Sequence, residues 1–199
     1  MADMVPTRTA AQRTDPAVIL EAVEELLESV GYDKWQLRDV AEVARVSLAT
    51  IYKHFPSRDE LILATVERWM NEHAYEPIQA RGPGEPLFDA LIRMFRTIFE
   101  PWEKHPMMLD AFVRASSSAG GERLFAQGVA SVEPMSGAFE GLDPSDVADV
   151  GEILTNVTFG AMSRYVVGAI PVTGILPAIE RTLSWLREPS ENRLATKEE

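Results

Sequence analysis

Apolar residues recur three and four positions apart along most of the chain, which places them on one side of successive α-helices. The alternation of apolar and polar residues that is typical of β-strands is absent from the sequence. Helix-start signals separate the periodic segments: Asp15 and Asp143 each precede a proline, and Ser57 opens a Ser-x-x-Glu capping box. The sequence therefore predicts an all-α protein.

The expected helices differ in length, and two of them contain an internal proline. They span about residues 16–30, 37–44, 48–55, 57–76, 86–104, 106–117, 122–139, 143–167 and 174–187. Pro101 is expected to kink or end its helix, and Pro134 to bend its own. Gly31 stands where a glycine ends the first helix.

A chain of 199 residues supports one compact domain, or a small module joined to a larger one. Residues 80–86 contain two glycines and two prolines and form the best candidate linker. We predict a small helical module in residues 1–60, a larger helical domain in residues 61–187 and a flexible tail in residues 188–199.

The composition excludes several classes of protein. Cysteine is absent, so the chain has no disulfide, thiolate zinc site or cysteine nucleophile. The start has no apolar stretch of signal-peptide length, and the longest uncharged run, residues 165–179, is too short to span a bilayer. We therefore expect a cytoplasmic protein without a membrane partner.

No residue pattern indicates catalysis. His54, His73 and His105 are scattered and never spaced with a carboxylate as metal ligands are. The chain also lacks a nucleophile elbow and a glycine-rich phosphate loop. We expect no metal, no cofactor and no enzymatic activity.

Charge is unevenly distributed along the chain. The formal net charge of −12 argues against nucleic acid as a partner. Between Lys34 and Arg58, however, five basic residues oppose two acidic ones, a net +3, whereas the chain from Asp59 onward carries −10. The same basic segment contains two short helices separated by a three-residue turn, which is the helix-turn-helix plan of DNA-binding proteins. The local charge therefore favours DNA where the total charge opposes it.

The same segment contains an ordered motif. It reads Leu37-Arg38-Asp39-Val40-Ala41, then Val46-Ser47, then Thr50-Ile51-Tyr52-Lys53-His54-Phe55-Pro56-Ser57-Arg58-Asp59-Glu60-Leu61. This motif resembles the N-terminal domain of TetR-type transcriptional regulators. Two shorter segments, Trp35-Gln36-Leu37-Arg38 and His105-Pro106-Met107-Met108 with residues 111–115, resemble repressors of steroid and lipid catabolism.

The resemblance implies roles for individual residues. Arg38 matches a position where some members read a base, and Tyr52 matches a tyrosine that bonds a phosphate while its ring packs in the turn. Ser47 is expected to cap the recognition helix, and Phe55 to lie in the core. The DNA-binding residues implied are Gln36, Arg38, Ser47, Ala49, Thr50, Tyr52, Lys53, His54 and Arg58.

Three positions depart from the family pattern. Gln36 replaces the usual threonine cap, and Ala49 replaces a small glycine of the recognition helix. Arg45 replaces the usual turn glycine, so a left-handed conformation there would cost roughly 1 kcal/mol or more. None of the three removes a phosphate contact.

The larger domain carries a Met and aromatic stripe, which on its own is more often core than binding site. Because the resemblance implies a ligand cavity in this domain, we expect part of the stripe to line it. The candidate ligand-binding residues are Met94, Phe95, Ile98, Phe99, Trp102, Met108, Phe112, Phe125 and Asn156. Arg96, Arg114 and Thr155 are further candidate polar anchors.

The last two helices are the expected dimer surface, because one helix-turn-helix reads only half of a palindromic operator. The candidate dimerisation residues are Val157, Gly160, Ala161, Ile179 and Leu183.

Together these observations predict a homodimeric transcriptional regulator that binds a palindromic operator. The resemblance implies a repressor, released when a hydrophobic effector shifts the helix of residues 61–76, which connects the cavity to the DNA-binding module. A lipid, a steroid and an acyl thioester remain open as effectors. The alternative is an all-α enzyme or adaptor protein that does not bind an operator.

Overall fold

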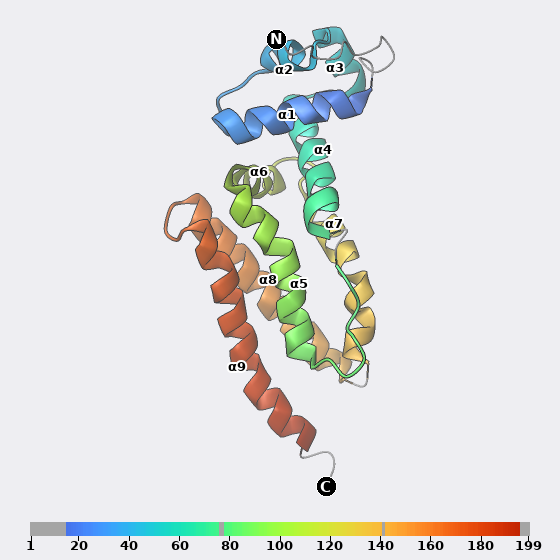
Figure 1. Cartoon of the computed structure of the whole chain (residues 1–199), viewed down its shortest axis with the longest axis vertical. Helices are drawn as coiled ribbons and strands as arrows, with labels where there is room; N and C mark the ends of the chain where they lie inside the picture. Colours follow the sequence, from blue (N-terminus) through green and yellow to red (C-terminus); the bar gives the residue numbers. More distant parts are fainter. Residues whose placement is uncertain (1–14, 76–77, 141, 196–199) are drawn as a thin grey trace, which may run out of the picture.

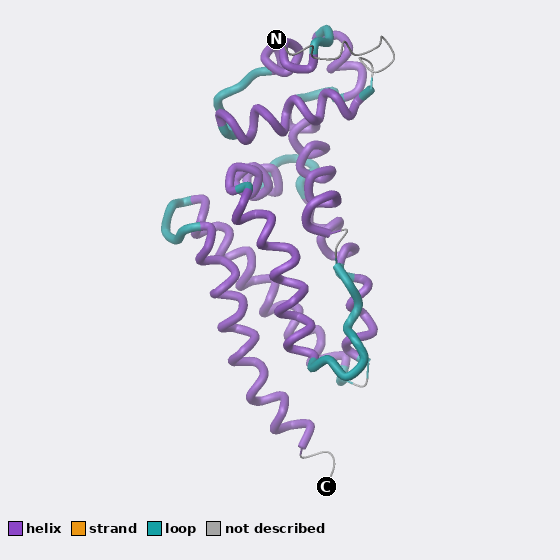
Figure 2. Tube along the Cα trace, in the orientation of Figure 1, coloured by secondary structure: helices purple, strands orange, loops and turns teal. Residues whose placement is uncertain are grey.

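A computed structural model describes residues 15–75, 78–140 and 142–195 of the chain. Every regular element in these ranges is helical, as predicted (Figures 1 and 2). The elements are α1 (Pro16–Val30), α2 (Leu37–Ala44), α3 (Leu48–His54), α4 (Arg58–Met70), the π-helical turn η2 (Asn71–Tyr75), α5 (Leu87–Lys104), α6 (Pro106–Ser116), α7 (Glu122–Ser131), the 3-10 segments η3 (Glu133–Phe139) and η4 (Val172–Gly174), α8 (Pro144–Val166) and α9 (Ile175–Ala195).

The ends of α1 are set by local signals. The Asp15 carboxylate accepts a hydrogen bond from the Ala17 amide at 3.0 Å, and Pro16 occupies the first helical position. Gly31 ends the helix with a φ of 85°, a conformation that favours glycine. A methyl group at Gly31 would also lie 2.8 Å from Cε of Met107, so glycine permits the close approach of α6.

The helices form two groups joined by α4 (Figure 1). In the first group, α1 packs against α2 and α4 around the fully buried side chains of Ile19, Val40 and Ile51. In the second group, α9 packs against α5 and α8. Since α4 contacts α1 at one end and α6 and α7 further along, it belongs to both groups.

The prolines have different effects on the helices that contain them. Helix α7 ends at Ser131, and Pro134 lies in a 3-10 segment instead of a continued α-helix, which confirms the predicted bend. Pro101 lies near the end of α5 but does not stop it, because the helix continues to Lys104.

The last helix is longer than predicted. It continues past the predicted end at residue 187 to Ala195. None of the described helices is long and apolar enough to cross a membrane.

Candidate DNA-binding surface and ligand cavity

Helix α3 is anchored to the core by a buried side chain and is capped at its first turn. Ile51 is fully buried beneath it, and the Ser47 hydroxyl accepts a hydrogen bond from the Thr50 amide at 3.1 Å, as expected of a cap. The outward face presents Ala49, Tyr52 and Lys53 to solvent. This is the arrangement in which a short helix can enter the major groove.

The two aromatic residues of the motif have different environments. Phe55 is only 8% exposed, which confirms the expectation of a core residue. Tyr52 is 55% exposed, so the expectation that its ring packs in the turn is wrong. Because Ile51 occupies the buried side of α3, the adjacent Tyr52 ring points to solvent, where its hydroxyl is accessible to a partner.

Arg45 adopts the left-handed conformation expected of the residue that replaces the turn glycine. Its φ is 55° and its ψ 43°. The next amide, that of Val46, donates to the Ala41 carbonyl at 3.0 Å and closes α2 in a Schellman motif. The Arg45 side chain is exposed beside the recognition helix.

Gln36 forms a better cap at the start of α2 than its residue type suggested. The Asp39 carboxylate accepts a hydrogen bond from the Gln36 amide at 2.7 Å, the reciprocal half of a capping box. The Gln36 and Arg38 side chains are exposed.

Arg58 is engaged within the chain. Its guanidinium lies 4.2 Å from the centre of the Trp35 ring and 5.1 Å from that of Tyr32, and it donates to the Tyr32 carbonyl. Arg58 therefore fastens the loop before α2 to the start of α4.

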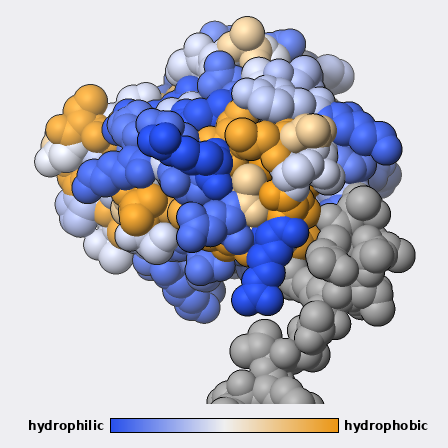
Figure 3. Space-filling view, turned by 90° about the horizontal axis from the view of Figure 1, so that it is seen from above, coloured by the Kyte–Doolittle hydropathy of each residue, from blue (hydrophilic) through white to orange (hydrophobic). Residues whose placement is uncertain are grey.

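The remaining predicted DNA-binding residues, Thr50 and His54, are half-buried. Figure 3 looks onto this end and shows hydrophilic side chains over much of it, with apolar groups between them.

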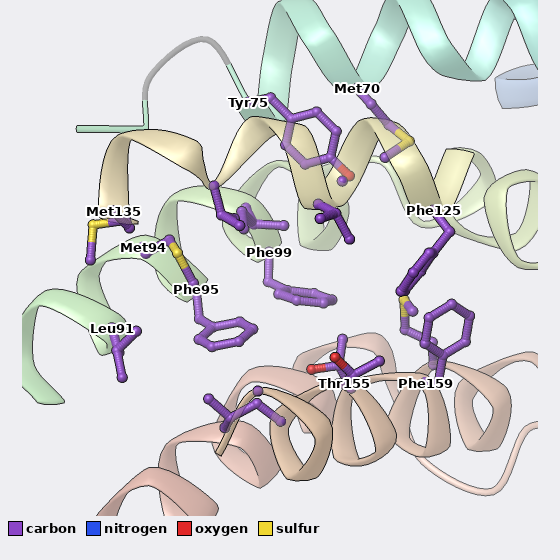
Figure 4. Close-up of a pocket in the computed structure, with 18 of the residues that line it drawn as sticks. Met70, Tyr75, Leu91, Met94, Phe95, Phe99, Phe125, Met135, Thr155 and Phe159 are labelled. Carbon is purple, nitrogen blue, oxygen red and sulfur yellow. The ribbon is translucent and has the colours of Figure 1, made fainter. Parts of the chain in front are cut away.

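The second group of helices encloses a cavity of about 350 Å³, at the lower end of the range for small-molecule sites. In Figure 4, Phe95 and Phe99 face it from α5, with Thr155 on α8 across from them. The lining residues are Met70, Tyr75, Leu91, Met94, Phe95, Ile98, Phe99, Trp102, Phe112, Leu124, Phe125, Gly128, Val129, Val132, Met135, Phe139, Val147, Val150, Gly151, Leu154, Thr155, Thr158, Phe159 and Met162.

Three hydroxyl-bearing side chains interrupt this apolar wall: Tyr75, Thr155 and Thr158. Burial raises the pKa of the Tyr75 phenol, so the group is neutral at physiological pH. The Thr158 Oγ1 is out of contact with solvent and has no hydrogen-bond partner among the described residues. A buried hydroxyl without a partner is an available site for a ligand oxygen.

Most of the predicted ligand-binding residues line the cavity, but two do not. The seven that line it are Met94, Phe95, Ile98, Phe99, Trp102, Phe112 and Phe125. Met108 is fully buried in the packing of α6 outside the cavity, and Asn156 is exposed on α8, one position beyond Thr155. A shift of one residue turns a helical side chain by about 100°, which explains why the neighbouring threonine faces the cavity instead.

The two arginines considered as polar anchors lie elsewhere. Arg96 pairs with Glu180 of α9 at 2.8 Å. Arg114 pairs with Asp33 at 3.2 Å and so ties α6 to the loop before α2. Tyr75 and Thr158 were not among the predicted ligand-binding residues. Nothing in their local sequence distinguishes a hydroxyl that faces a cavity from a hydroxyl buried in the core or exposed on the surface.

The cavity is connected to α4 by direct packing. Met70 is the last residue of α4 and lines the cavity. Trp102, also in the wall, lies 4.4 Å from Trp69 of α4 between ring centres. A ligand in the cavity therefore contacts the helix that begins next to the recognition helix.

A polar link joins α4 to α7, another wall of the cavity. Arg123 of α7 pairs with Glu60 at 2.6 Å and with Glu67 at 2.8 Å, both on α4. Gln127, one turn further, donates to the Glu67 carbonyl at 2.8 Å. Leu124 and Phe125 lie beside Arg123 and line the cavity, so these polar contacts join the cavity wall directly to α4.

The predicted dimerisation residues divide between core and surface. Ala161, Ile179 and Leu183 are buried within the single chain, Val157 is half-buried, and Gly160 is exposed. A contact between two copies through α8 and α9 would therefore use Gly160 together with other exposed side chains of the same helices. Trp185 of α9 is 79% exposed and Ile153 of α8 is 40% exposed.

Comparison with known proteins agrees with this geometry. Residues 19–65 match the family described as bacterial regulatory proteins, tetR family, and residues 84–186 match the tetracyclin repressor-like C-terminal domain. The second match alone covers more than half of the chain. The chain belongs to the TetR family of transcriptional regulators.

Among curated relatives, the chain is similar to the HTH-type transcriptional repressor KstR of Rhodococcus jostii, with 27% identity over 192 residues, 88% of this chain and 84% of the relative. The KstR repressor of Mycolicibacterium smegmatis is 28% identical over 137 residues, 62% of this chain and 67% of the relative.

Solved structures share the fold. A TetR transcriptional regulator from Rhodococcus sp. RHA1 aligns with a TM-score of 0.68 and 20% identity, over 86% of this chain and 97% of that one. FadR of Thermus thermophilus, a TetR-family repressor in complex with lauroyl-CoA, aligns with a TM-score of 0.52 and 17% identity, over 87% of this chain and 94% of that one.

Proposed function

We propose that this protein is a homodimeric repressor that binds a palindromic operator and leaves it when a hydrophobic small molecule enters the cavity. The observation that carries the proposal is the position of α4, which lines the cavity through Met70 and begins at Arg58, four residues after the recognition helix. We assign the protein no catalytic role and place it in the cytoplasm, where operator DNA lies.

The DNA-binding half of the proposal rests on the outward face of α2 and α3. Arg38 offers a guanidinium for a bidentate contact with guanine, and Lys53 offers an ammonium to a phosphate. Both side chains are exposed, as is the Tyr52 ring. The Arg45 side chain, exposed at the turn, adds a further cation to this surface.

The release mechanism follows from contacts of α4. A ligand that prefers a displaced position of α4 would move the Arg58 end and, with it, the loop that Arg58 holds through Trp35. Two recognition helices bind half-sites about 34–36 Å apart, so a small rotation of each is sufficient to lose the register. A 100-fold loss of operator affinity needs about 2.7 kcal/mol of differential ligand affinity between the two states.

For the dimer, we propose a surface on α8 and α9 centred on Ile153, Gly160 and Trp185. Large exposed aromatic side chains are uncommon on a monomer and are enriched at the centres of interfaces. Ile153 and Gly160 are seven residues apart and share one face of α8. Gly160 has nothing within 4 Å of an added Cβ, which leaves space for a second helix to approach.

The relatives support the effector half of the proposal. Two of them are named as KstR repressors, and the FadR structure contains lauroyl-CoA, a hydrophobic ligand. The apolar cavity of this chain suits a hydrophobic molecule as well.

The test is selection of operator DNA from genomic fragments at moderate salt, followed by footprinting. We expect enrichment of a palindromic fragment by the wild-type protein and loss of that enrichment for Tyr52→Phe combined with Lys53→Ala. Unchanged binding by the double variant would show that α3 does not carry the contacts. Absence of any enriched palindrome would favour the enzyme or adaptor alternative.

A further inference from the structure

We propose that the effector is an uncharged hydrophobic molecule with a hydroxyl or carbonyl group, and that the site discriminates against acyl thioesters of coenzyme A. This inference rests on the proposed function, since it concerns the ligand of the same cavity. Its basis is the difference between a cavity whose described lining carries no charged residue and an opening flanked by glutamates.

The interior holds no ionisable group apart from the Tyr75 phenol. Among the described lining residues there is no Asp, Glu, Lys, Arg or His. Transfer of an ion into such surroundings without a partner is strongly unfavourable. The part of the ligand that enters the cavity is therefore uncharged.

One polar group on the ligand is favoured, however. The Thr158 Oγ1 is buried and has no partner among the described residues, and the Tyr75 hydroxyl points into the cavity in Figure 4. Hydroxyls can both donate and accept, so either a ligand carbonyl or a ligand hydroxyl can pair with them. A pure hydrocarbon would leave Thr158 unsatisfied.

The cavity opens between α7 and α8. Its lining residues that are exposed to solvent are Phe125 and Val129 on α7 and Gly151 and Thr155 on α8. At this edge the side chains of Phe125 on α7 and Phe159 on α8 approach each other, with ring centres 6.0 Å apart (Figure 4). Any part of the ligand too large for the cavity emerges here.

Carboxylates flank this opening on both helices. Glu122 shares a face of α7 with Val129, seven residues later, and Glu152 shares a face of α8 with Phe159 by the same spacing. Both glutamates are exposed. Residues 124–163 contain six acidic residues and no Lys or Arg.

The cations nearest along the chain are directed away from the opening or held by other groups. Arg164 lies nine residues after Thr155, two and a half helical turns, and so on the opposite face of α8. Arg123 extends to Glu60 and Glu67 of α4. Arg81 donates to the carbonyls of Glu85 and Ala138. The phosphates of a coenzyme A group at the opening would therefore meet repulsion without a compensating partner, and salt would screen that repulsion.

The test compares ligands that share a twelve-carbon chain. The full-length protein, without DNA, is loaded with the neutral fluorescent probe N-phenyl-1-naphthylamine, which is displaced by 1-dodecanol or by lauroyl-CoA, each below its aggregation concentration. We expect dodecanol to displace the probe at a concentration about tenfold lower than lauroyl-CoA, with a smaller difference at high salt. Equal potency, or tighter binding of lauroyl-CoA, would overturn the inference and leave the repressor proposal intact.

Variants assign the discrimination to its parts. Glu122→Gln with Glu152→Gln should strengthen lauroyl-CoA binding severalfold and leave dodecanol unchanged, whereas Glu100→Gln, an exposed glutamate of α5, should change neither. Thr158→Val, of nearly equal volume, should weaken dodecanol about fivefold through the lost hydrogen bond. Unchanged lauroyl-CoA binding in the double variant would contradict the role of the rim. If neither probe nor ligands bind, the inference and the proposed effector response fail together.

Discussion

The DNA-binding end and the cavity end of this molecule recognise their partners in opposite ways. At the first end, exposed polar and basic side chains project from two short helices whose own core is small. At the other, the recognition surface is internal and apolar, and exposed glutamates flank its opening on α7 and α8. The net charge of −12 is thus a sum over two unlike regions and describes neither of them.

This difference shows how one chain can favour DNA at one end and reject phosphates at the other. Attraction to DNA depends on the +3 segment between Lys34 and Arg58, and the acidic body opposes any other docking orientation. Four measurements test this contrast between the two ends of the molecule.

The largest effect is expected from Trp185→Arg. A charge at the centre of the proposed dimer surface should cost roughly 2–4 kcal/mol of association, as for other interface hot spots. Operator affinity would fall about 100-fold, because each monomer binds only one half-site. Light scattering and DNA titration measure both quantities. The control is Ala119→Arg, which adds the same charge at an exposed site outside α8 and α9. A Trp185→Arg variant that remains as dimeric as the wild type would refute the proposed surface.

At the DNA-binding end, Arg38→Met and Lys53→Met should differ in kind. Loss of a bidentate guanine contact is expected to cost about 1–3 kcal/mol and to relax sequence preference at one operator position. Loss of a phosphate contact should weaken all sequences alike and lower the slope of log K against log salt by about 1. Titrations of matched and mismatched operators at several salt concentrations distinguish them. Equal loss on all sequences for Arg38→Met would exclude base readout by this residue.

Between the two ends, Arg123→Gln should weaken communication more than binding. The variant removes the ion pairs with Glu60 and Glu67 and leaves the cavity wall intact. We expect unaltered ligand affinity in the absence of DNA and a coupling free energy reduced by about 0.5–2 kcal/mol. Arg96→Gln, which removes an ion pair between α5 and α9, is the matched control. Operator release that is identical in the two variants would exclude Arg123 from the coupling.

The smallest effect is expected at Arg45. Arg45→Gly should relieve the left-handed conformation and stabilise the fold by about 1 kcal/mol, whereas Arg45→Ala retains the conformation and loses the same charge. Thermal unfolding should show a difference of roughly 2–4 °C between the two variants, with glycine the more stable. A more stable alanine variant would contradict the strain assigned to this turn.

Local signals in the sequence were sufficient for the helices and for the DNA-binding end. Asp15, Ser47 and Ser57 cap the helices that they were expected to cap. Arg45 adopts the left-handed conformation that its place in the turn required. These features depend on a few neighbouring residues, so a linear sequence specifies them.

Local signals could not distinguish the residues of the larger domain that line the cavity from those that lie in the core or on the surface. Met108 and Phe112 lie on one helix and both are buried, yet only Phe112 lines the cavity. Thr155 lines the cavity at its opening, whereas its neighbour Asn156 does not line it. Ile179 and Leu183 are buried within one chain, while Trp185 is left exposed. Helical spacing gives the face on which a residue lies but does not say what that face meets.

The all-α class, most helix boundaries, the family motif and the opposite charge of the two regions can be read from the amino-acid sequence, because caps, turns and periodicity act over a few residues. Three-dimensional packing selects which apolar side chains surround the cavity, places its opening between Phe125 and Thr155, and brings Arg123 of α7 to α4. These features depend on the packing of helices that are far apart in the chain, and many apolar sequences would satisfy the same local pattern with a different interior.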